Sequence, residues 1–291
     1  MALFCNTPTA AFIYYNKRVL KIVVFSTIIL VSCKSFVDID PPSTAVTSEA
    51  VFSSDKTSIA VLNGTYAAMS GGPGGEVVEG TSSIRSLGFR LGLLSDELTL
   101  WEMSDNSKSP YYLNALSSQN EPPGYWTYFY KEIFMANSVI NGLEKSNSVT
   151  PIVKSQLIGE ALFLRALHLF YLTNLYGAIP VPLTTDYTEI NKLGRRPVRE
   201  VYEQIISDLN LAQQQLSSEF LDGTLLKSTT SRVRPTKWAA TALLSRVYLF
   251  MEDYANAELE STKVIESNLF SLVPLDEEFL MNSRLRYGSC R

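Results

Sequence analysis

The amino-acid sequence predicts an all-α fold built from helical hairpins, and three observations support this prediction. Apolar residues recur at spacings of three and four residues in most segments after residue 48, which is the period of an amphipathic helix. Proline and glycine stand at the ends of such segments, as Pro151 and Gly177 do. The pattern A-L-x-x-R at residues 161–165 returns at residues 242–246, 81 residues later, which is close to two units of a helical-hairpin repeat.

The composition is that of an ordinary globular protein. The chain has 291 residues, enough for one large domain or two small ones, of which 46% are hydrophobic and 19% charged. The formal net charge is −4. Residues 1–32 hold three of the 25 basic residues and no acid, so the remainder has 22 basic and 29 acidic residues, a net charge of −7. No basic cluster is present to neutralise phosphates, which argues against nucleic-acid binding.

The first 32 residues are typical of a bacterial signal peptide. Lys17, Arg18 and Lys21 precede the ten apolar or small residues 22–31, the order of a positive n-region and a hydrophobic h-region. Ten residues are too few to cross a hydrocarbon core, which takes about 20 in helical form. We therefore expect export and cleavage rather than a membrane-spanning helix.

Cys33 is the predicted attachment point of a lipid. Residues 30–33, L-V-S-C, resemble the bacterial lipobox, with an aliphatic residue at −3, a small residue at −1 and a cysteine whose thiol is joined to a diacylglycerol. Two acyl chains anchor a protein stably, whereas one chain binds a membrane only marginally. The alternative interpretation is a short buried strand that ends in a packed cysteine.

The remaining cysteines and the single histidine predict neither a disulfide nor a cofactor. Cleavage before Cys33 removes Cys5 and leaves Cys290 alone, so no internal disulfide is expected. Without a CxxC pair, His168 cannot complete a zinc site. It lies in a very apolar segment, and we expect it to be packed and hydrogen-bonded rather than catalytic.

The first elements after Cys33 are a tether, a helix and a loop. Residues 33–48 mix prolines, acids and hydroxyls, as an extended tether does. Thr47 or Ser48 can cap a helix whose first turn holds Glu49 and whose periodic run covers residues 52–69. Residues 70–80, SGGPGGEVVEG, hold too much glycine for a helix and lack the signature of a phosphate-binding loop.

The same period predicts five further helices, over residues 125–145, 151–176, 198–216, 236–250 and 254–267. The helix over residues 151–176 is apolar on nearly every face, so we expect it at the centre of its bundle. The hairpin over residues 236–267 resembles a tetratricopeptide unit, and a degenerate unit spans residues 125–176. Small residues at Ala242, Ala255 and Ala257 are expected to let the two backbones of the first hairpin approach closely.

Three motifs in this order resemble the SusD/RagB family of Bacteroidetes outer-membrane lipoproteins. The lipobox precedes F-x-D-I-D-P-P-S-T at residues 36–44. The motifs E-A-L-F-L-R-A-L-H-L-F-Y-L-T-N-L-Y-G-A-I-P-V-P at residues 160–182 and R-P-T-K-W-A-A-x-A-L-L-S-R-V-Y-L at residues 234–249 follow. The resemblance covers residues 30–283 and implies an all-α, SusD-like fold, a tetratricopeptide-like helical-hairpin scaffold with loop insertions.

The resemblance also implies a domain organisation. Residues 1–32 are the lipoprotein signal peptide, residues 33–48 the N-terminal tether, and residues 49–283 the SusD-like helical domain with tetratricopeptide-like repeats. Residues 284–291 read as an aberrant tail, and we expect the C-terminal half of the family to be missing.

The function that the resemblance implies is nutrient capture at the cell surface. A lipid-anchored member binds an oligosaccharide, or in some branches a peptide, and closes as a lid over a SusC-like TonB-dependent outer-membrane barrel, its partner. No covalent bond of the ligand is broken, so no enzymatic activity is expected.

The resemblance implies that ligand contacts come from residues 94–112, and four residues there are candidates. Trp101 offers an indole face for the apolar side of a sugar ring, while Asp105 and Asn106 can bond its hydroxyls. Tyr111 is a weaker candidate. The alternative is that Trp101 is a core residue and the acids a solvated loop. Trp126 and Trp238 lie among apolar residues at helical spacing, which predicts that both pack in the core.

Two other functions remain open at this level. Asp96 with Glu97, or Glu102 with Asp105, provide the two carboxylates that a glycosidase needs, although no other catalytic motif accompanies them. A lipid-anchored tetratricopeptide adaptor for protein–protein interaction is the second alternative.

Overall fold

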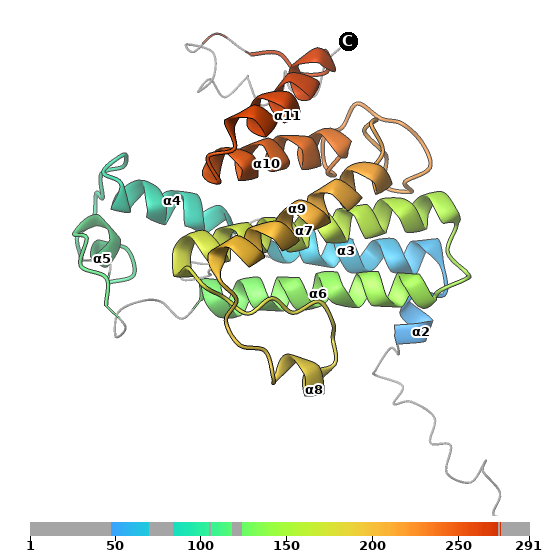
Figure 1. The fold of residues 1–291 in the computed structure, drawn as a ribbon, viewed down its shortest axis with the longest axis horizontal. Helices are drawn as coiled ribbons and strands as arrows, with labels where there is room; N and C mark the ends of the chain where they lie inside the picture. Colours follow the sequence, from blue (N-terminus) through green and yellow to red (C-terminus); the bar gives the residue numbers. More distant parts are fainter. Residues whose placement is uncertain (1–47, 70–83, 105, 118–123, 273, 275–291) are drawn as a thin grey trace, which may run out of the picture. The chain divides into compact units, whose positions relative to one another are not determined.

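The computed structural model describes residues 48–69, 84–104, 106–117, 124–272 and 274, and there the expected all-α fold is confirmed (Figure 1). The helices are α2 (Ser48–Val51), α3 (Asp55–Met69), α4 (Ile84–Leu94), α5 (Ser109–Tyr112), α6 (Tyr125–Lys145), α7 (Pro151–Tyr176), α8 (Tyr187–Ile190), α9 (Val198–Gln215), α10 (Lys237–Phe250) and α11 (Tyr254–Glu266). Within these ranges, extended pairing is limited to two isolated bridges, Ile179 with Arg196 and Leu221 with Ser228.

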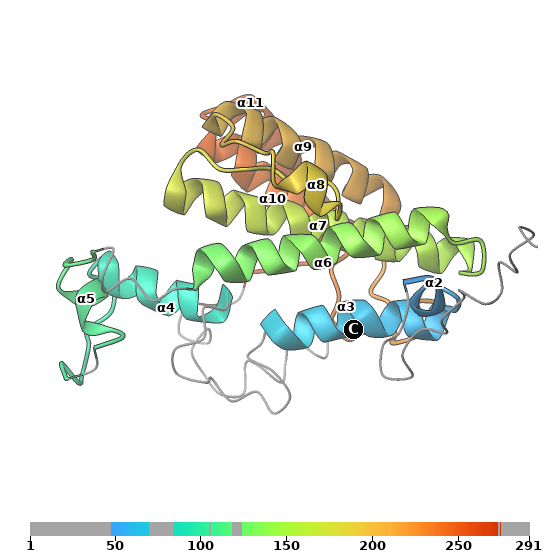
Figure 2. The ribbon, with the colours of Figure 1, turned by 90° about the horizontal axis from the view of Figure 1, so that it is seen from below.

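Helix α7 lies at the centre of the bundle, as its apolar sequence predicts. Figure 2 shows α3 and α6 on one side of it and α9 and α10 on the other. Buried leucines occur along its whole length, at Leu157, Leu164 and Leu172. Pro151 opens the helix, where a missing N–H costs no hydrogen bond, and Gly177 follows its end with a φ of 71°, which favours glycine.

A buried ion pair joins three helices of this bundle. Arg165 of α7 donates from Nε and Nη2 to the two carboxylate oxygens of Asp208 on α9, both at 2.7 Å. Its Nη1 donates to Oδ1 of Asn137 on α6 at 2.8 Å, and Asn137 Nδ2 donates to the carbonyl oxygen of Pro182 at 3.0 Å. Because each buried polar group has a partner, the pair can hold α6, α7 and α9 together without a desolvated, uncompensated charge.

The helices pair as hairpins, α6 with α7 and α10 with α11 (Figure 1). Ala257 is buried where α11 meets α10, and Ser245 Oγ donates to its carbonyl oxygen at 2.8 Å. Ala242 and Ala255, however, are exposed. The expectation that they line a close contact is therefore wrong, and the buried residues of α10 are Ala240, Thr241, Leu243, Leu244 and Val247.

Helices α2 and α3 divide the single helix expected from residue 48 to residue 69. The chain turns after Val51, and Ser54 Oγ then accepts from the N–H of Thr57 at 3.3 Å, a helix-capping contact. The turn directs Phe52, which is 6% exposed, onto Gly142 of α6. A Cβ atom at Gly142 would lie 2.1 Å from the Phe52 ring, so the glycine is needed for this contact.

The periodicity alone does not predict α4 and α5. Gly88 and Gly92 interrupt the apolar pattern of α4 and lower its intrinsic helix propensity, and α5 is a single turn. Cys33, Cys290 and the glycine-rich residues 70–80 lie outside the described residues. In the part of the chain that the structure describes, no helix has the length and apolar character needed to span a bilayer.

Candidate ligand-binding site

Trp101 lies in the loop between α4 and α5, and its side chain is 99% exposed. This excludes the alternative that it is a core residue. An indole in water can gain free energy when a ligand covers it, at roughly 25 cal/mol per Å² of apolar surface removed from solvent. The structure therefore leaves the ring available for stacking against a ligand.

A tight turn at the end of α4 gives the Trp101 loop a defined start. The N–H of Leu98 donates to the carbonyl oxygen of Gly92 at 2.9 Å, and Ser95 N–H donates to that of Leu91, also at 2.9 Å. The side chain of Leu98 lies over Gly92, where a Cβ atom would be 2.9 Å from its Cδ1. Asp96 adopts a φ of 60° at the turn. The chain folds back over the last turn of α4 because Gly92 has no side chain.

Tyr111 holds the far end of this loop against the helices. It is 5% exposed, and the Arg90 guanidinium carbon lies 5.5 Å from its ring centroid. The same carbon lies 5.5 Å from the ring centroid of Tyr125 at the start of α6, and Arg90 Nη1 donates to Tyr125 Oη at 3.3 Å. Tyr111 is thus packed as a support in this structure and presents no open face, which its proposed contact role would need.

Polar groups flank Trp101 on the loop. Asn106 is exposed, and its amide offers both donors and an acceptor. Ser104 Oγ donates to Glu102 Oε1 at 2.9 Å, and both residues are exposed. Asp105, the other predicted contact, lies outside the described residues. An indole with nearby amide and carboxylate groups suits a ligand that has apolar faces and hydroxyl edges.

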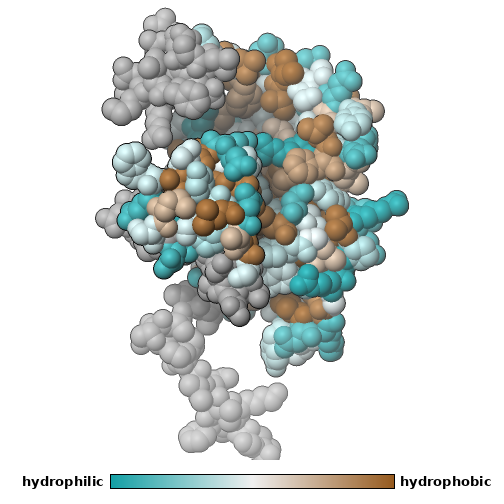
Figure 3. Space-filling view, turned by 90° about the vertical axis from the view of Figure 1, so that its left-hand side faces the viewer, coloured by the Kyte–Doolittle hydropathy of each residue, from teal (hydrophilic) through white to brown (hydrophobic). Residues whose placement is uncertain are grey.

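Apolar side chains surround the Trp101 loop on α4, the loop itself and the segment after α5. The large exposed ones are Phe89, Leu98, Met103, Leu113 and Leu116. Figure 3 shows apolar side chains gathered on this side of the molecule, interleaved with polar ones. Such mixed surfaces are more typical of binding sites than of an uninterrupted solvated face.

The structure contains none of the arrangements that a hydrolase or metal enzyme would use within the described residues. Asp96, Glu97 and Glu102 are all exposed loop carboxylates. Three or more His, Cys, Asp or Glu side chains do not converge as a metal site anywhere in the described ranges.

Trp126 and Trp238 are packed, although neither is fully buried. Trp126 makes an edge contact with Tyr176 at 5.2 Å between ring centroids, and the guanidinium of Arg195 lies 5.1 Å from its ring. Trp238 donates from Nε1 to the carbonyl oxygen of Ser218 at 3.0 Å. Their placement agrees with a structural role at the edge of the core.

Burial shifts the pKa values of two titratable groups on α6 and α7. His168 is fully buried and its Nδ1–H donates to the carbonyl oxygen of Leu164 at 2.7 Å, as expected of a packed histidine. Burial lowers the pKa of His168 to about 4, although that hydrogen bond opposes the shift. Glu132 of α6 is also buried, and burial raises the pKa of its carboxyl to about 7, against the effect of Lys131.

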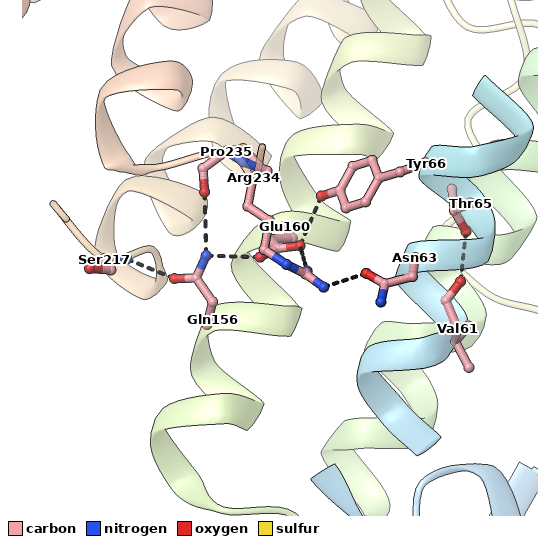
Figure 4. Close-up of polar contacts among 9 residues, drawn as sticks. All are labelled: Val61, Asn63, Thr65, Tyr66, Gln156, Glu160, Ser217, Arg234 and Pro235. Atoms are coloured by element: carbon pink, nitrogen blue, oxygen red, sulfur yellow. Dashed lines mark hydrogen bonds and ion pairs between the residues drawn. The ribbon is translucent and has the colours of Figure 1, made fainter. Parts of the chain in front are cut away.

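A second buried network lies where α3, α7 and the chain before α10 meet (Figure 4). Arg234 Nη1 donates to Glu160 Oε2 at 2.7 Å, and Tyr66 Oη donates to the same oxygen at 2.9 Å. Gln156 Nε2 donates to Glu160 Oε1 at 2.9 Å, while its Oε1 accepts from the N–H of Ser217 at 2.9 Å. Burial raises the pKa of Glu160, while Arg234 is the strongest opposing influence.

Sequence reasoning misses this network, because its members are far apart in the chain. Glu160 and Arg234 open two of the three motifs described above, yet 74 positions separate them. The only signal was that each motif combines a charged residue with an otherwise apolar segment. In the structure both side chains are buried and paired with each other. These two motif residues therefore hold the scaffold together and do not face a ligand.

Comparison with known proteins identifies relatives that match parts of the chain. The sequence model of a family described as "SusD-like_3: Starch-binding associating with outer membrane" matches residues 92–249. A SusD-like protein of Bacteroides ovatus is 35% identical over 138 residues, which is 46% of this chain and 23% of that protein. The solved structure of a SusD-like protein from Bacteroides fragilis covers 79% of this chain with a TM-score of 0.62 and 22% identity, and 40% of its own chain is covered.

A third relative is a solved structure named as a laminarin-binding SusD-like protein. It is 26% identical, with a TM-score of 0.50, and the alignment covers 56% of this chain and 34% of that chain. The chain thus spans less than half the length of these relatives. Since the family model matches more than half of the residues, with the helical fold in agreement, the chain belongs to the SusD-like family.

Proposed function

We propose that the protein is an outer-membrane surface lipoprotein that binds an oligosaccharide nutrient and delivers it to a SusC-like TonB-dependent transporter. The Trp101 loop is the ligand contact in this proposal, with Asn106 and Asp105 as hydrogen-bonding partners. A peptide ligand is the alternative within the same function. The lipid at Cys33 would keep the binding domain beside its transporter.

The observation that carries the proposal is the fully exposed indole on a loop with a defined base. Indole faces cover the C–H side of a pyranose, and neighbouring amide and carboxylate groups bond the hydroxyls. Trp101 is 99% exposed, and Leu98 and Tyr111 fix the two ends of its loop. The family description as starch-binding and the laminarin-binding relative support a glycan as the ligand class.

The test is isothermal titration of the purified chain with malto-oligosaccharides and laminarin fragments. Trp101→Ala should weaken the binding of the glycan that the wild type accepts by about tenfold or more, because the stacking surface is lost. The free energy of unfolding should change by less than about 0.5 kcal/mol, since the side chain packs against nothing.

Tyr187→Ala is the matched control, because it removes another exposed aromatic ring, on α8. Its affinity should equal that of the wild type. The proposal fails if no glycan binds, or if both variants lose affinity equally. Binding of a protein from the outer membrane without any glycan binding would favour the adaptor alternative.

The anchor and the transporter need separate measurements. Mass spectrometry of the protein from its native membrane should show a diacylglycerol on Cys33 and no residues before it. A wild-type chain that is unacylated at Cys33 would contradict the anchor. Cross-linking in native membranes should recover a TonB-dependent barrel, and recovery of an unrelated partner alone would contradict the proposed delivery.

A further inference from the structure

We propose that Arg90, held between Tyr111 and Tyr125, recognises a carboxylate of the ligand, so that the site selects acidic glycans such as uronic-acid oligomers. This inference rests on the proposed function and specifies its ligand class. It follows from the charge of one buried side chain and from the geometry around it.

Arg90 differs from the other buried arginines on α7 and before α10. Arg165 is paired with Asp208 and Arg234 with Glu160, each at 2.7 Å. Arg90 is equally buried, at 4% exposure, yet no carboxylate among the described residues is within ion-pair distance of it. Buried charges are normally paired, because desolvation without a counter-charge is costly. Because no counter-charge lies among the described residues, we assign Arg90 as a site for an anion.

The guanidinium also has unused donors. Of its nitrogens, Nη1 donates to Tyr125 Oη at 3.3 Å, a long hydrogen bond. Enclosed side-chain atoms without a partner in the described residues are Tyr128 Oη, Glu132 Oε2 and His168 Nε2. Arg90 Nε and Nη2 make no hydrogen bond to a described residue, so both remain available to a ligand. Two adjacent N–H groups on one edge match the two oxygens of a carboxylate.

The two tyrosine rings fix this edge in place. Each ring centroid lies 5.5 Å from the guanidinium carbon, within the range of a cation–π contact. Tyr125 begins α6, and Ser86 Oγ lies 3.0 Å from its Oη in a further hydrogen bond. Arg90 and Tyr111 belong to the two helices that flank the Trp101 loop, and in this proposal an acidic sugar contacts both the indole and the guanidinium.

The experiment compares trigalacturonate with its methyl ester, which differ in charge but not in the sugar ring. Isothermal titration of the wild type should show about tenfold tighter binding of the acid, the size of a charge-assisted hydrogen-bond contribution. Arg90→Gln should bind the acid and the ester equally. Arg199→Gln, which removes an exposed guanidinium on α9, should keep the tenfold preference.

Arg90→Lys is the second variant, and it keeps the positive charge without the planar pair of donors. It should lose most of the preference, and a lysine variant that kept all of it would overturn bidentate recognition. Thermal unfolding followed by circular dichroism checks that each variant is folded. Equal binding of acid and ester by the folded wild type would overturn the proposal.

The outcome also separates this inference from the proposed function. If the wild type binds neutral laminaritriose but does not prefer the acid, the function stands and the role of Arg90 fails. If no glycan binds, the function fails, and acetate then tests the anion site alone. Acetate should shift the Arg90 Nε–H resonance in ¹⁵N-resolved NMR spectra, and the absence of that shift would overturn the assignment.

Discussion

The bundle and the region around Trp101 place charged and aromatic side chains in opposite ways. In the bundle, Arg165 and Arg234 are buried on carboxylates that come from other segments of the chain. Around the loop, Trp101 is in solvent, and Arg90 is buried with no carboxylate of the described residues within ion-pair distance. The two arginines of the bundle have counter-charges within the fold, whereas Arg90 has none among the described residues, and a ligand carboxylate would supply one in the proposed site.

This difference separates the residues that hold the fold from those that can bind. The two longest sequence motifs lie in the bundle, and Glu160 and Arg234 within them are structural. The Trp101 loop has no such motif, and its neighbours are exposed. The sequence motifs of the bundle therefore indicate how its helices pack. The candidate ligand contacts are instead side chains that take no part in that packing.

Of the variants predicted below, the one that removes Glu160 from the buried network should lower the free energy of unfolding the most. Glu160→Ala deprives Arg234, Tyr66 and Gln156 of their shared acceptor and leaves a buried guanidinium unpaired. The free energy of unfolding should fall by about 3–5 kcal/mol, measured by urea denaturation. Arg199→Ala, which breaks an exposed pair with Glu203, should cost about 0–0.5 kcal/mol. A similar small loss in both variants would show that the buried network does not stabilise the bundle.

The raised pKa of Glu132 should be detectable in the pH dependence of the free energy of unfolding. Its folded-state pKa of about 7 exceeds the ordinary value of 4.5, so the folded chain binds the proton more tightly than the unfolded chain does. The resulting stabilisation is complete below pH 4.5 and is lost as the pH rises towards 7. Glu132→Gln cannot titrate, so its stability relative to the wild type should rise across this window, by at most ~3 kcal/mol.

The titration of His168 does not disturb this comparison between Glu132→Gln and the wild type. Its pKa of about 4 in the folded protein lies below the ordinary 6.5, so it adds stability as the pH rises between these values. Both chains contain His168, and its contribution therefore cancels in the difference. A stability difference that stays constant with pH would contradict the shifted pKa of Glu132.

Two glycines distinguish the regions more finely. Gly142→Ala in the bundle would drive a Cβ atom into the buried Phe52 ring and should cost about 1–3 kcal/mol of unfolding free energy. Gly92→Ala meets only side-chain atoms of the half-exposed Leu98, which can move into solvent, so the cost should be below about 1 kcal/mol. The loop variant should nevertheless bind glycan more weakly, because Leu98 must move. Equal costs for both variants in urea denaturation would remove the distinction.

The smallest expected effect is that of a single amide on the loop. Asn106→Ala should weaken glycan binding by about twofold to tenfold through the loss of one or two hydrogen bonds, with no change in unfolding. Asn147→Ala, an exposed asparagine in the turn between α6 and α7, is the control for titration calorimetry. Undiminished affinity in the first variant would exclude Asn106 from the site.

The sequence predicted the bundle closely and the binding region poorly. The bounds of α6 and α7 were predicted correctly, since a strong apolar period and Pro151 mark them. Helix α4 was not predicted, because Gly88 and Gly92 weaken its pattern while tertiary contacts with α5 and α6 stabilise it. The exposure of Trp101 could not be predicted either, because a tryptophan near acidic residues is compatible with a core position as well as with an exposed loop.

The sequence also did not predict which distant segments contact each other. Nothing in the local sequence shows that Glu160 meets Arg234, or that Tyr111 packs on Arg90 while Trp101 does not pack at all. Such contacts depend on how the helices are arranged in space. Period and capping residues determine where a helix lies, whereas the faces that meet are determined by the assembled bundle.

The exposure of Trp101 makes the protein its own optical reporter. Trp126 and Trp238 are partly packed, so their emission is shielded from aqueous quenchers, whereas the indole at position 101 is open to iodide. A sugar that stacks on it would shield it and shift its emission to the blue, while the other two indoles provide a constant background. Occupancy of the loop can therefore be followed by intrinsic fluorescence, without a label.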